Sequence, residues 1–143
     1  MGRFDSIKAV DRLIEAYDDL KKNNFDTPNL LLVGPTDSEY AKKLVARVDE
    51  LELSSFIKFF GSCFGHEKWK LLKRADALIL PSYHENFGMV IVEALSQGTP
   101  VLISNNVNIH KDIELSGAGL VFDNSVNGIA SAIKKYCRLG SAL

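Results

Sequence analysis

The stretch that decides the fold is SYHENFGMVIVEAL, residues 82–95. It follows a short apolar run at residues 77–80 that Pro81 closes, and it leads through QGTP, residues 97–100, into a second apolar run at residues 101–103. Short apolar runs bounded by proline and glycine are typical of buried strands, and the segment between them is long enough for a helix. The pattern therefore predicts a strand, a loop, a helix and a second strand.

Two carboxylates bracket the predicted helix: Glu85 lies in the loop at its start, and Glu93 lies inside it. In a helix, Glu93 shares one side with Val90 and Gln97, so its charge needs either water or a partner. In the simpler interpretation, Glu93 points to solvent and Glu85 is favoured by the helix dipole. The other interpretation is a ligand site, because Gly88 leaves the first backbone N–H groups accessible and ligands bind at the carboxyl ends of strands in open α/β sheets.

The composition bounds the class of protein. The chain has 143 residues, of which 46% are hydrophobic, which fits one domain with a sizeable core. A formal net charge of −1 gives no basic footprint for nucleic acid. No apolar run approaches the ~20 residues of a membrane span. Cys63 and Cys137 lack a metal-type spacing and are interpreted as reduced thiols, so we expect a cytoplasmic protein.

Strands and helices are predicted to alternate along the whole chain. Apolar runs predict strands at residues 29–33, 56–60, 77–80, 100–103 and 120–122. The first of these runs is continuously apolar, so we expect it to be buried on both faces. Apolar stripes predict helices at about residues 7–20, 40–51, 69–75, 107–115 and 129–136, besides the helix that begins near residues 87–89. This alternation predicts an α/β fold, a Rossmann-like doubly wound parallel sheet of about six strands with helices on both faces. The first strand of the six is absent or reduced to a stub at the amino end of the chain.

The order of the motifs resembles the family 4 retaining glycosyltransferases of the GT-B type. The resemblance rests on the E-x7-E pair Glu85 and Glu93, on Pro81-Ser82 before it, and on EALSQGTPV at residues 93–101. Gly2-Arg3 followed by Lys8 is similar to the family's Gly-Arg…Lys element. Four further motifs fall in family order: LVG at 32–34, FFG at 59–61, ADA at 75–77 and GLV at 119–121.

The resemblance implies that residues 1–143 form a single donor-binding domain, the C-terminal half of a GT-B enzyme whose N-terminal acceptor domain is absent. Such enzymes transfer a sugar from a UDP-, GDP- or ADP-sugar to a glycan or lipid-linked acceptor with retention, and they require no metal or other cofactor. The expected partners are the donor and, through the missing domain, the acceptor, without nucleic acid. We also expect peripheral membrane association of the full enzyme, self-association of the fragment, and little turnover by the isolated chain.

By the same resemblance, three charged residues have catalytic roles. Arg3 and Lys8 would neutralise the leaving diphosphate, and Glu85 would face the donor sugar near the reacting carbon. Glu93 would accept hydrogen bonds from the ribose hydroxyls. The remaining donor-binding residues are Asn86, Phe87 and Gly88 at the sugar–phosphate site, and Ser62 and Cys63 near the nucleobase. Outside the site, His84 is interpreted as an exposed loop residue and Trp69 as a core residue.

The chain also departs from the family pattern. Residues 105–114 lack the family's glutamate and glycines, so no ligand contact is assigned there. Most of the strand that normally precedes Gly2 is missing, and in a sheet of order 3-2-1-4-5-6 that strand is central, so its neighbours would lack ladder partners. Two alternatives remain: a non-catalytic α/β module that binds a partner protein, and an epimerase or phosphorylase of the same architecture. The E-x7-E series argues against the epimerase, and no lysine is placed convincingly for pyridoxal phosphate.

Overall fold

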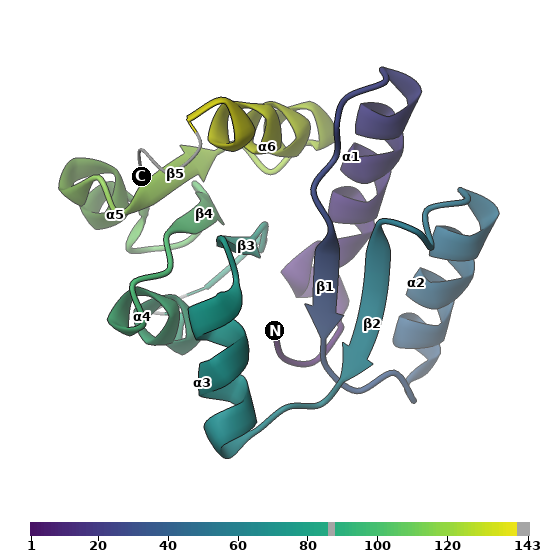
Figure 1. Cartoon of the computed structure of the whole chain (residues 1–143), viewed down its shortest axis with the longest axis horizontal. Helices are drawn as coiled ribbons and strands as arrows, with labels where there is room; N and C mark the ends of the chain where they lie inside the picture. Colours follow the sequence, from purple (N-terminus) through teal and green to yellow (C-terminus); the bar gives the residue numbers. More distant parts are fainter. Residues whose placement is uncertain (86–87, 140–143) are drawn as a thin grey trace.

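The computed structural model describes residues 1–85 and 88–139, in which helices and strands alternate as predicted (Figure 1). The strands are β1 (Leu30–Val33), β2 (Ile57–Gly61), β3 (Leu78–Leu80), β4 (Val101–Ser104) and β5 (Gly119–Phe122). The helices are the 3-10 helix η1 (Ser6–Lys8) and the α-helices α1 (Val10–Lys22), α2 (Glu39–Glu50), α3 (Gly65–Arg74), α4 (Met89–Ser96), α5 (His110–Ser116) and α6 (Val126–Leu139).

The described strands form two parallel sheets rather than one. Strands β1 and β2 pair in the first sheet, and the second has the order β3-β4-β5. The predicted single sheet of about six strands is therefore wrong for this structure, which has five strands in the described residues. The physical reason lies at the amino end, where residues 1–4 contribute the hydrogen bond from Gly2 N–H to Val33 O, at 2.9 Å, but no strand that could pair with both β1 and β3.

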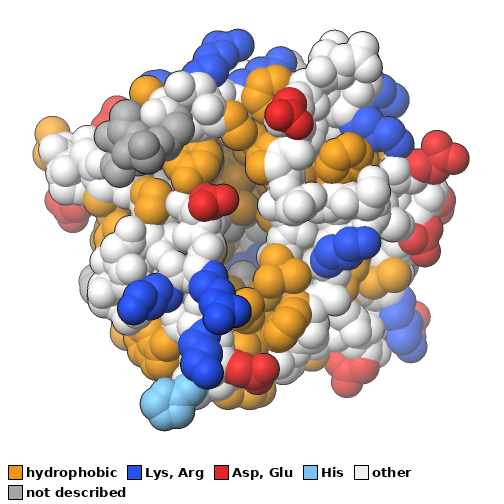
Figure 2. All heavy atoms as spheres, viewed as in Figure 1, with side chains coloured by type: hydrophobic (Ala, Val, Ile, Leu, Met, Phe, Trp, Pro, Cys, Tyr) orange, Lys and Arg blue, Asp and Glu red, His pale blue; other side chains and the backbone are white. Residues whose placement is uncertain are grey.

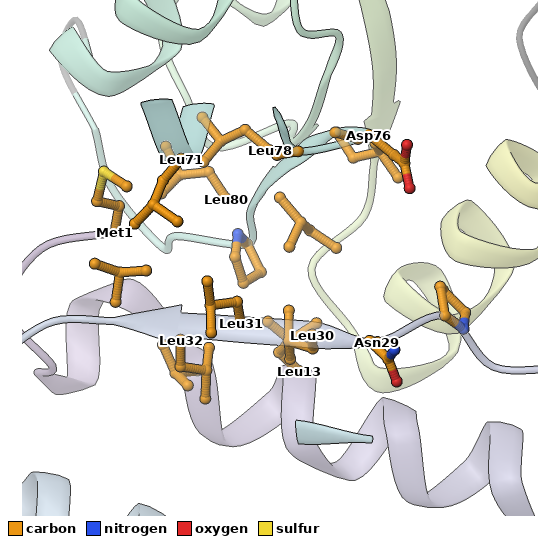
Figure 3. A pocket seen from close by; sticks show the side chains of 18 of the residues that line it. Met1, Leu13, Asn29, Leu30, Leu31, Leu32, Leu71, Asp76, Leu78 and Leu80 are labelled. Carbon is orange, nitrogen blue, oxygen red and sulfur yellow. The ribbon is translucent and has the colours of Figure 1, made fainter. Parts of the chain in front are cut away.

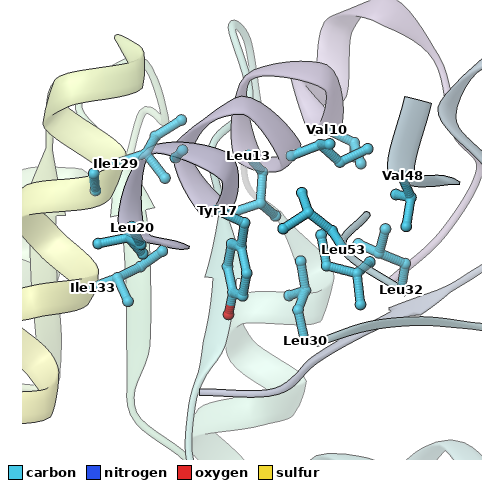
Figure 4. Packing of buried hydrophobic residues seen from close by; sticks show 14 of the residues in the cluster. Val10, Leu13, Tyr17, Leu20, Leu30, Leu32, Val48, Leu53, Ile129 and Ile133 are labelled. Carbon is cyan, nitrogen blue, oxygen red and sulfur yellow. The ribbon is translucent and has the colours of Figure 1, made fainter. Parts of the chain in front are cut away.

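Two hydrophobic clusters follow the two sheets. The larger cluster packs α1, α2 and α6 against β1 and β2, and it also includes Leu102 of β4 and Phe122 of β5. In it, Leu20 of α1 lies beside Ile129 and Ile133 of α6 (Figure 4). The smaller cluster packs α3, α4 and α5 against β3 and β4. Because α6 follows β5 in the chain, its contact with α1 holds the two sheets together by burial of apolar surface.

The predicted first helix is broken near its start. Asp5 caps η1 by accepting hydrogen bonds from the backbone N–H groups of Ile7 and Lys8, at 3.1 and 3.3 Å. Ala9 then adopts a left-handed conformation, with φ 56°, and α1 begins only at Val10. A left-handed alanine costs about 1 kcal/mol. The hydrogen bond from Tyr83 N–H to Ile7 O, at 2.8 Å, helps to offset this cost and places η1 beside the loop after β3.

Two burial predictions are wrong. Strand β1 was expected to be buried on both faces, but Leu31 is 43% exposed because its side chain points into a cavity between the sheets. Trp69 was expected in the core, but it is 38% exposed, and Leu72 is the buried residue of α3. His84 is exposed, as predicted.

Replacement of Gly34 by alanine is expected to destabilise the chain. A Cβ atom at this position would lie 2.0 Å from Gly2 O and 3.2 Å from the Phe4 ring, so the amino end would have to move away from β1. We expect Gly34→Ala to lower the free energy of unfolding in urea by about 1–3 kcal/mol. Thr36→Ala, at an exposed position in the same turn, is the control. Equal stability of the two variants would contradict this account.

Candidate functional site

Four charged side chains from four segments pair near the carboxyl end of β3. Lys8 Nζ of η1 contacts Glu85 Oε1 of the loop after β3 in an ion pair. Lys68 Nζ of α3 lies 2.7 Å from Glu93 Oε2 of α4. All four side chains are less than a third exposed, and the two carboxylates are 16% and 17% exposed. Lys68 is therefore the partner of the Glu93 carboxylate, which lies within the apolar helix α4.

The two ion pairs lie close to each other. Burial and, to a smaller extent, the positive charges of Lys8 and Lys68 lower the pKa of the Met1 amino group to about 6, against an opposing effect of Glu85. One amino group thus experiences charges from both pairs. Of the predicted site residues, the structure pairs Lys8 with Glu85, and it pairs Glu93 with Lys68, which was not predicted.

The loop that carries Glu85 is fixed to the end of β4. Glu85 forms a parallel β-bridge with Val107, and its carbonyl oxygen accepts a hydrogen bond from the Asn108 N–H at 3.0 Å. Below it, the buried Ser104 hydroxyl donates to the carbonyl oxygen of Ser82 at 2.8 Å. These bonds hold the Glu85 backbone in place, so the direction of its carboxylate depends on few free torsions.

The amino end of α4 follows the loop that carries Glu85. Gly88 precedes Met89 with φ 68°, a left-handed conformation that favours glycine. No side chain of the described residues caps the first turn of α4. Its first backbone N–H groups, together with the positive end of the helix dipole, are therefore available to an anion.

Arg3 is exposed and lines the same cavity as Met1 and Lys8. Within residues 1–85 and 88–139 it makes no ion pair, so its guanidinium is free to contact a ligand. Arg12, which the sequence analysis did not single out, lies over the Tyr83 ring with its guanidinium carbon 4.7 Å from the ring centroid. It also donates a hydrogen bond to Asn124 O at 3.0 Å, which joins the loop after β3 to the end of β5.

The predicted nucleobase residues follow β2 directly. Ser62 is exposed and Cys63 is buried, and both precede α3, which carries Lys68. Desolvation, with a smaller contribution from Glu67, raises the pKa of the Cys63 thiol, so the thiol is neutral at pH 7 and suited to packing rather than nucleophilic chemistry. Asn86 and Phe87, which were assigned to the sugar–phosphate site, lie outside the described residues.

Lys68 is the site residue that sequence reasoning missed. It lies in HEKWKLLKR, a basic run in which several lysines look equivalent. The signal that could have found it is its spacing from Leu72, because residues four apart share one side of a helix. Since Leu72 is the buried residue of α3, Lys68 is directed toward the interior edge where Glu93 lies.

In the part of the chain that the structure describes, no three His, Cys, Asp or Glu side chains are grouped so that they could hold a metal ion. No helix among the same residues is long and apolar enough to cross a bilayer.

Parallel strands covered by helices, with charged side chains after the strands, define an α/β domain. The sequence profile of the family described as "Glycosyl transferases group 1" matches residues 1–141. The chain belongs to this family, and its fold is similar to that of GT-B glycosyltransferase domains.

Relatives and solved structures agree with this family. The chain is 36% identical over 104 residues to a D-inositol 3-phosphate glycosyltransferase of a Mycobacterium species, a match that covers 71% of this chain and 23% of that protein. It is 34% identical over 124 residues to the O-antigen chain mannosyltransferase RfbU of Salmonella typhimurium, which covers 86% of this chain and 34% of that protein. Sucrose-phosphate synthase from Thermosynechococcus elongatus superposes with a TM-score of 0.82 at 28% identity, over 96% of this chain and 35% of that one.

A further solved structure contains ligands. The Anabaena protein HepE in complex with UDP and glucose has a TM-score of 0.77 at 25% identity, over 94% of this chain and 37% of that one. The chain thus spans about a quarter to a little more than a third of the length of these four proteins.

The ion pair between Lys68 and Glu93 is expected to contribute measurably to stability. In a double-mutant cycle of Lys68→Met and Glu93→Gln, we expect a coupling energy of about 1–2 kcal/mol, because both charges are largely shielded from water. The cycle is measured by urea unfolding of the four proteins. Lys42 and Glu39 form a matched exposed pair on α2, for which a coupling of about 0–0.5 kcal/mol is expected. Equal coupling in the two cycles would argue against a shielded site.

A pH dependence follows for the 143-residue polypeptide with a free amino terminus. The pKa of the Met1 amino group is about 6 in the folded chain and 8.0 without burial, so between these values unfolding takes up a proton. The free energy of unfolding should therefore rise by roughly 1–3 kcal/mol between pH 6 and pH 8. Below pH 6 the folded chain bears the full cost of burying the protonated amino group. Urea unfolding at three pH values, with the N-acetylated chain as control, measures the effect. The acetylated chain should lack this part of the rise.

Proposed function

We propose that this chain is the donor-binding part of a family 4 retaining glycosyltransferase, in which Glu85 and Glu93 are the E-x7-E motif. The reaction would transfer a sugar from a nucleoside diphosphate sugar to a glycan or lipid-linked acceptor. The observations that carry the proposal are the two partly buried Lys–Glu pairs and the amino end of α4, which no side chain of the described residues caps. This arrangement offers cations and N–H donors to phosphate, and carboxylates to hydroxyl groups.

The leaving diphosphate gains negative charge as the sugar departs, so groups that stabilise this charge lower the barrier. In the proposal, Lys8, Arg3 and the first N–H groups of α4 meet the diphosphate. Without a ligand, Lys8 is neutralised by Glu85. A bound diphosphate would compete for Lys8 and leave the Glu85 carboxylate facing the donor sugar near its reacting carbon.

Glu93 would bind the ribose of the nucleotide. Because the Glu93 carboxylate is only 17% exposed, folding has already removed most of its water. Accepting hydrogen bonds from two vicinal hydroxyl groups would therefore require little further loss of water. Lys68, at 2.7 Å, would hold the carboxylate in one direction during this contact. The backbone and Ser62 at the end of β2 would lie against the nucleobase, with the buried Cys63 beside them.

The relatives support a nucleotide-sugar donor. HepE is described in complex with UDP and glucose, and RfbU is named as a mannosyltransferase. Since the chain spans about a third of their length, we assign the acceptor to the rest of the enzyme. Transfer requires both reactants in one closed cleft, so the isolated chain should bind donor and turn over little. The reduced thiols Cys63 and Cys137 favour a cytoplasmic location for the reaction.

Isothermal titration of the 143-residue chain with UDP, GDP and ADP tests the donor site. We expect one of the three to bind, and Glu93→Gln to weaken it by roughly 10- to 100-fold, because a charge-assisted hydrogen bond contributes about 1.5–3 kcal/mol. Glu114→Gln, at an exposed position on α5, is the matched control and should bind as the unaltered chain does. The absence of heat with all three nucleotides, from a folded sample, would contradict the proposal.

A further inference from the structure

Arg12 of α1 contacts two loops at once. Its guanidinium carbon lies 4.7 Å from the centroid of the Tyr83 ring, in the loop after β3. Its Nη1 group donates a hydrogen bond to Asn124 O, in the loop after β5, at 3.0 Å. A planar guanidinium can lie over a ring and donate hydrogen bonds in its own plane at the same time. Since Asn124 is only 6% exposed, this hydrogen bond is largely shielded from water.

The register of α1 directs Arg12 away from the hydrophobic core. The buried side chains of Val10, Leu13 and Tyr17 follow each other at spacings of three and four residues, and they pack in the larger cluster (Figure 4). Arg12 does not belong to this stripe, because residues at such spacings share one side of a helix and Arg12 lies between them. It is nevertheless half-buried, and the two loops that it contacts account for this burial.

The contacts of Arg12 lie outside the apolar cavity between the sheets. That cavity has a volume of about 400 Å³, and the surface is hollowed at the centre of this face (Figure 2). Leu31 points from β1 toward the side where the leucines of β3 lie (Figure 3). Neither Arg12 nor Tyr83 nor Asn124 lines the cavity. The contacts of Arg12 therefore do not depend on what fills the space between β1 and β3.

Tyr83 connects Arg12 to the segment that carries Lys8. The N–H of Tyr83 donates to Ile7 O at 2.8 Å, which attaches the loop to the residue before Lys8. The ring of Tyr83 lies against Arg12, four residues after Lys8. The loop is thus attached on both sides of Ala9, whose left-handed conformation forms the turn between η1 and α1. Loss of the ring contact would leave the angle at this turn less constrained.

The constraint on Tyr83 reaches Glu85 through a short piece of chain. Glu85 is two residues after Tyr83, and the β-bridge with Val107 holds its backbone. Since one residue separates the two anchored positions, a shift of Tyr83 changes the direction of the Glu85 carboxylate. Within residues 1–85 and 88–139, Arg12 forms no ion pair, so it holds the loop without neutralising Glu85.

We propose that Arg12 is a positioning residue for Glu85. Through the Tyr83 ring and the Asn124 carbonyl, it holds the loop after β3 where Glu85 meets Lys8. A second part of the proposal rests on the proposed function: once a diphosphate has taken Lys8, the same contacts keep the Glu85 carboxylate directed at the donor sugar. Arg12 itself does not touch the donor, because the ring and the carbonyl already occupy its guanidinium.

The first part is tested without a ligand. The coupling energy between Lys8→Met and Glu85→Gln is measured by urea unfolding in the unaltered chain, and again in a chain that carries Arg12→Gln. We expect Arg12→Gln to remove about half of this coupling or more, because the two charges no longer meet in one geometry. If Arg12 contributed to stability alone, it would lower the free energy of unfolding of all four proteins equally. An unchanged coupling would therefore overturn the proposal.

Three further backgrounds localise the effect. Tyr83→Phe keeps the ring and should preserve the coupling, whereas Tyr83→Leu removes the ring and should act as Arg12→Gln does. Arg47→Gln is the matched control, because Arg47 also attaches α1 to a neighbouring element, through an ion pair with Glu15 at 2.7 Å. This control should lower stability and preserve the coupling. Equal coupling with Tyr83→Phe and Tyr83→Leu, or its loss with Arg47→Gln, would contradict the role of Arg12.

Isothermal titration tests the second part. The probes are UDP with UDP-glucose, GDP with GDP-mannose, and ADP with ADP-glucose. For the pair that the unaltered chain binds, Arg12→Gln should weaken the nucleotide sugar by about three- to tenfold more than the free nucleotide, because Glu85 faces only the sugar. An equal effect on both, or none, would overturn this part. If the folded chain binds none of the six, the donor site is contradicted, and the coupling measurement still decides the role of Arg12.

Discussion

The contact between η1 and the loop after β3 is the interaction on which the site depends. The hydrogen bond from Tyr83 N–H to Ile7 O fixes the two segments side by side, and the ion pair between Lys8 and Glu85 follows from it. One segment leads into α1, which covers the first sheet, and the other belongs to the second sheet. No strand of the described residues joins these sheets. The charged residues of the two sheets are therefore brought together by loops and side chains that connect the sheets.

Contacts between elements that cover the two sheets hold these sheets together. The contact of α1 with α6 buries Leu20, Ile129 and Ile133 at one end of the molecule. Near the amino end of α1, Arg12 lies over the Tyr83 ring and donates a hydrogen bond to Asn124 O. The apolar contact supplies most of the free energy, because burial of large aliphatic side chains contributes about 1.5–3 kcal/mol each. The polar contacts set the relative position of the charged residues.

Local patterns in the sequence predicted the strands and most helices, because alternation and apolar spacing report on burial. They also indicated that Glu93 needs either water or a partner. The break at Ala9 could not be predicted, since alanine favours a continuous helix and the left-handed turn depends on Asp5 and on the distant Tyr83. Lys68 was missed because helical lysines are usually solvated. The division into two sheets, and with it the exposure of Leu31, depends on which strands meet in space.

The turn at Ala9 has a consequence for how motion would spread through the domain. Only this residue separates Lys8 from α1, a rod of 13 residues and about 20 Å in length. A rod that is packed on α6 at its far end moves as a unit, so a small tilt there displaces its near end. Displacement of α6 would thereby change the distance between the Lys8 ammonium and the Glu85 carboxylate. A contact made on α6 would then alter the electrostatic field around Glu85.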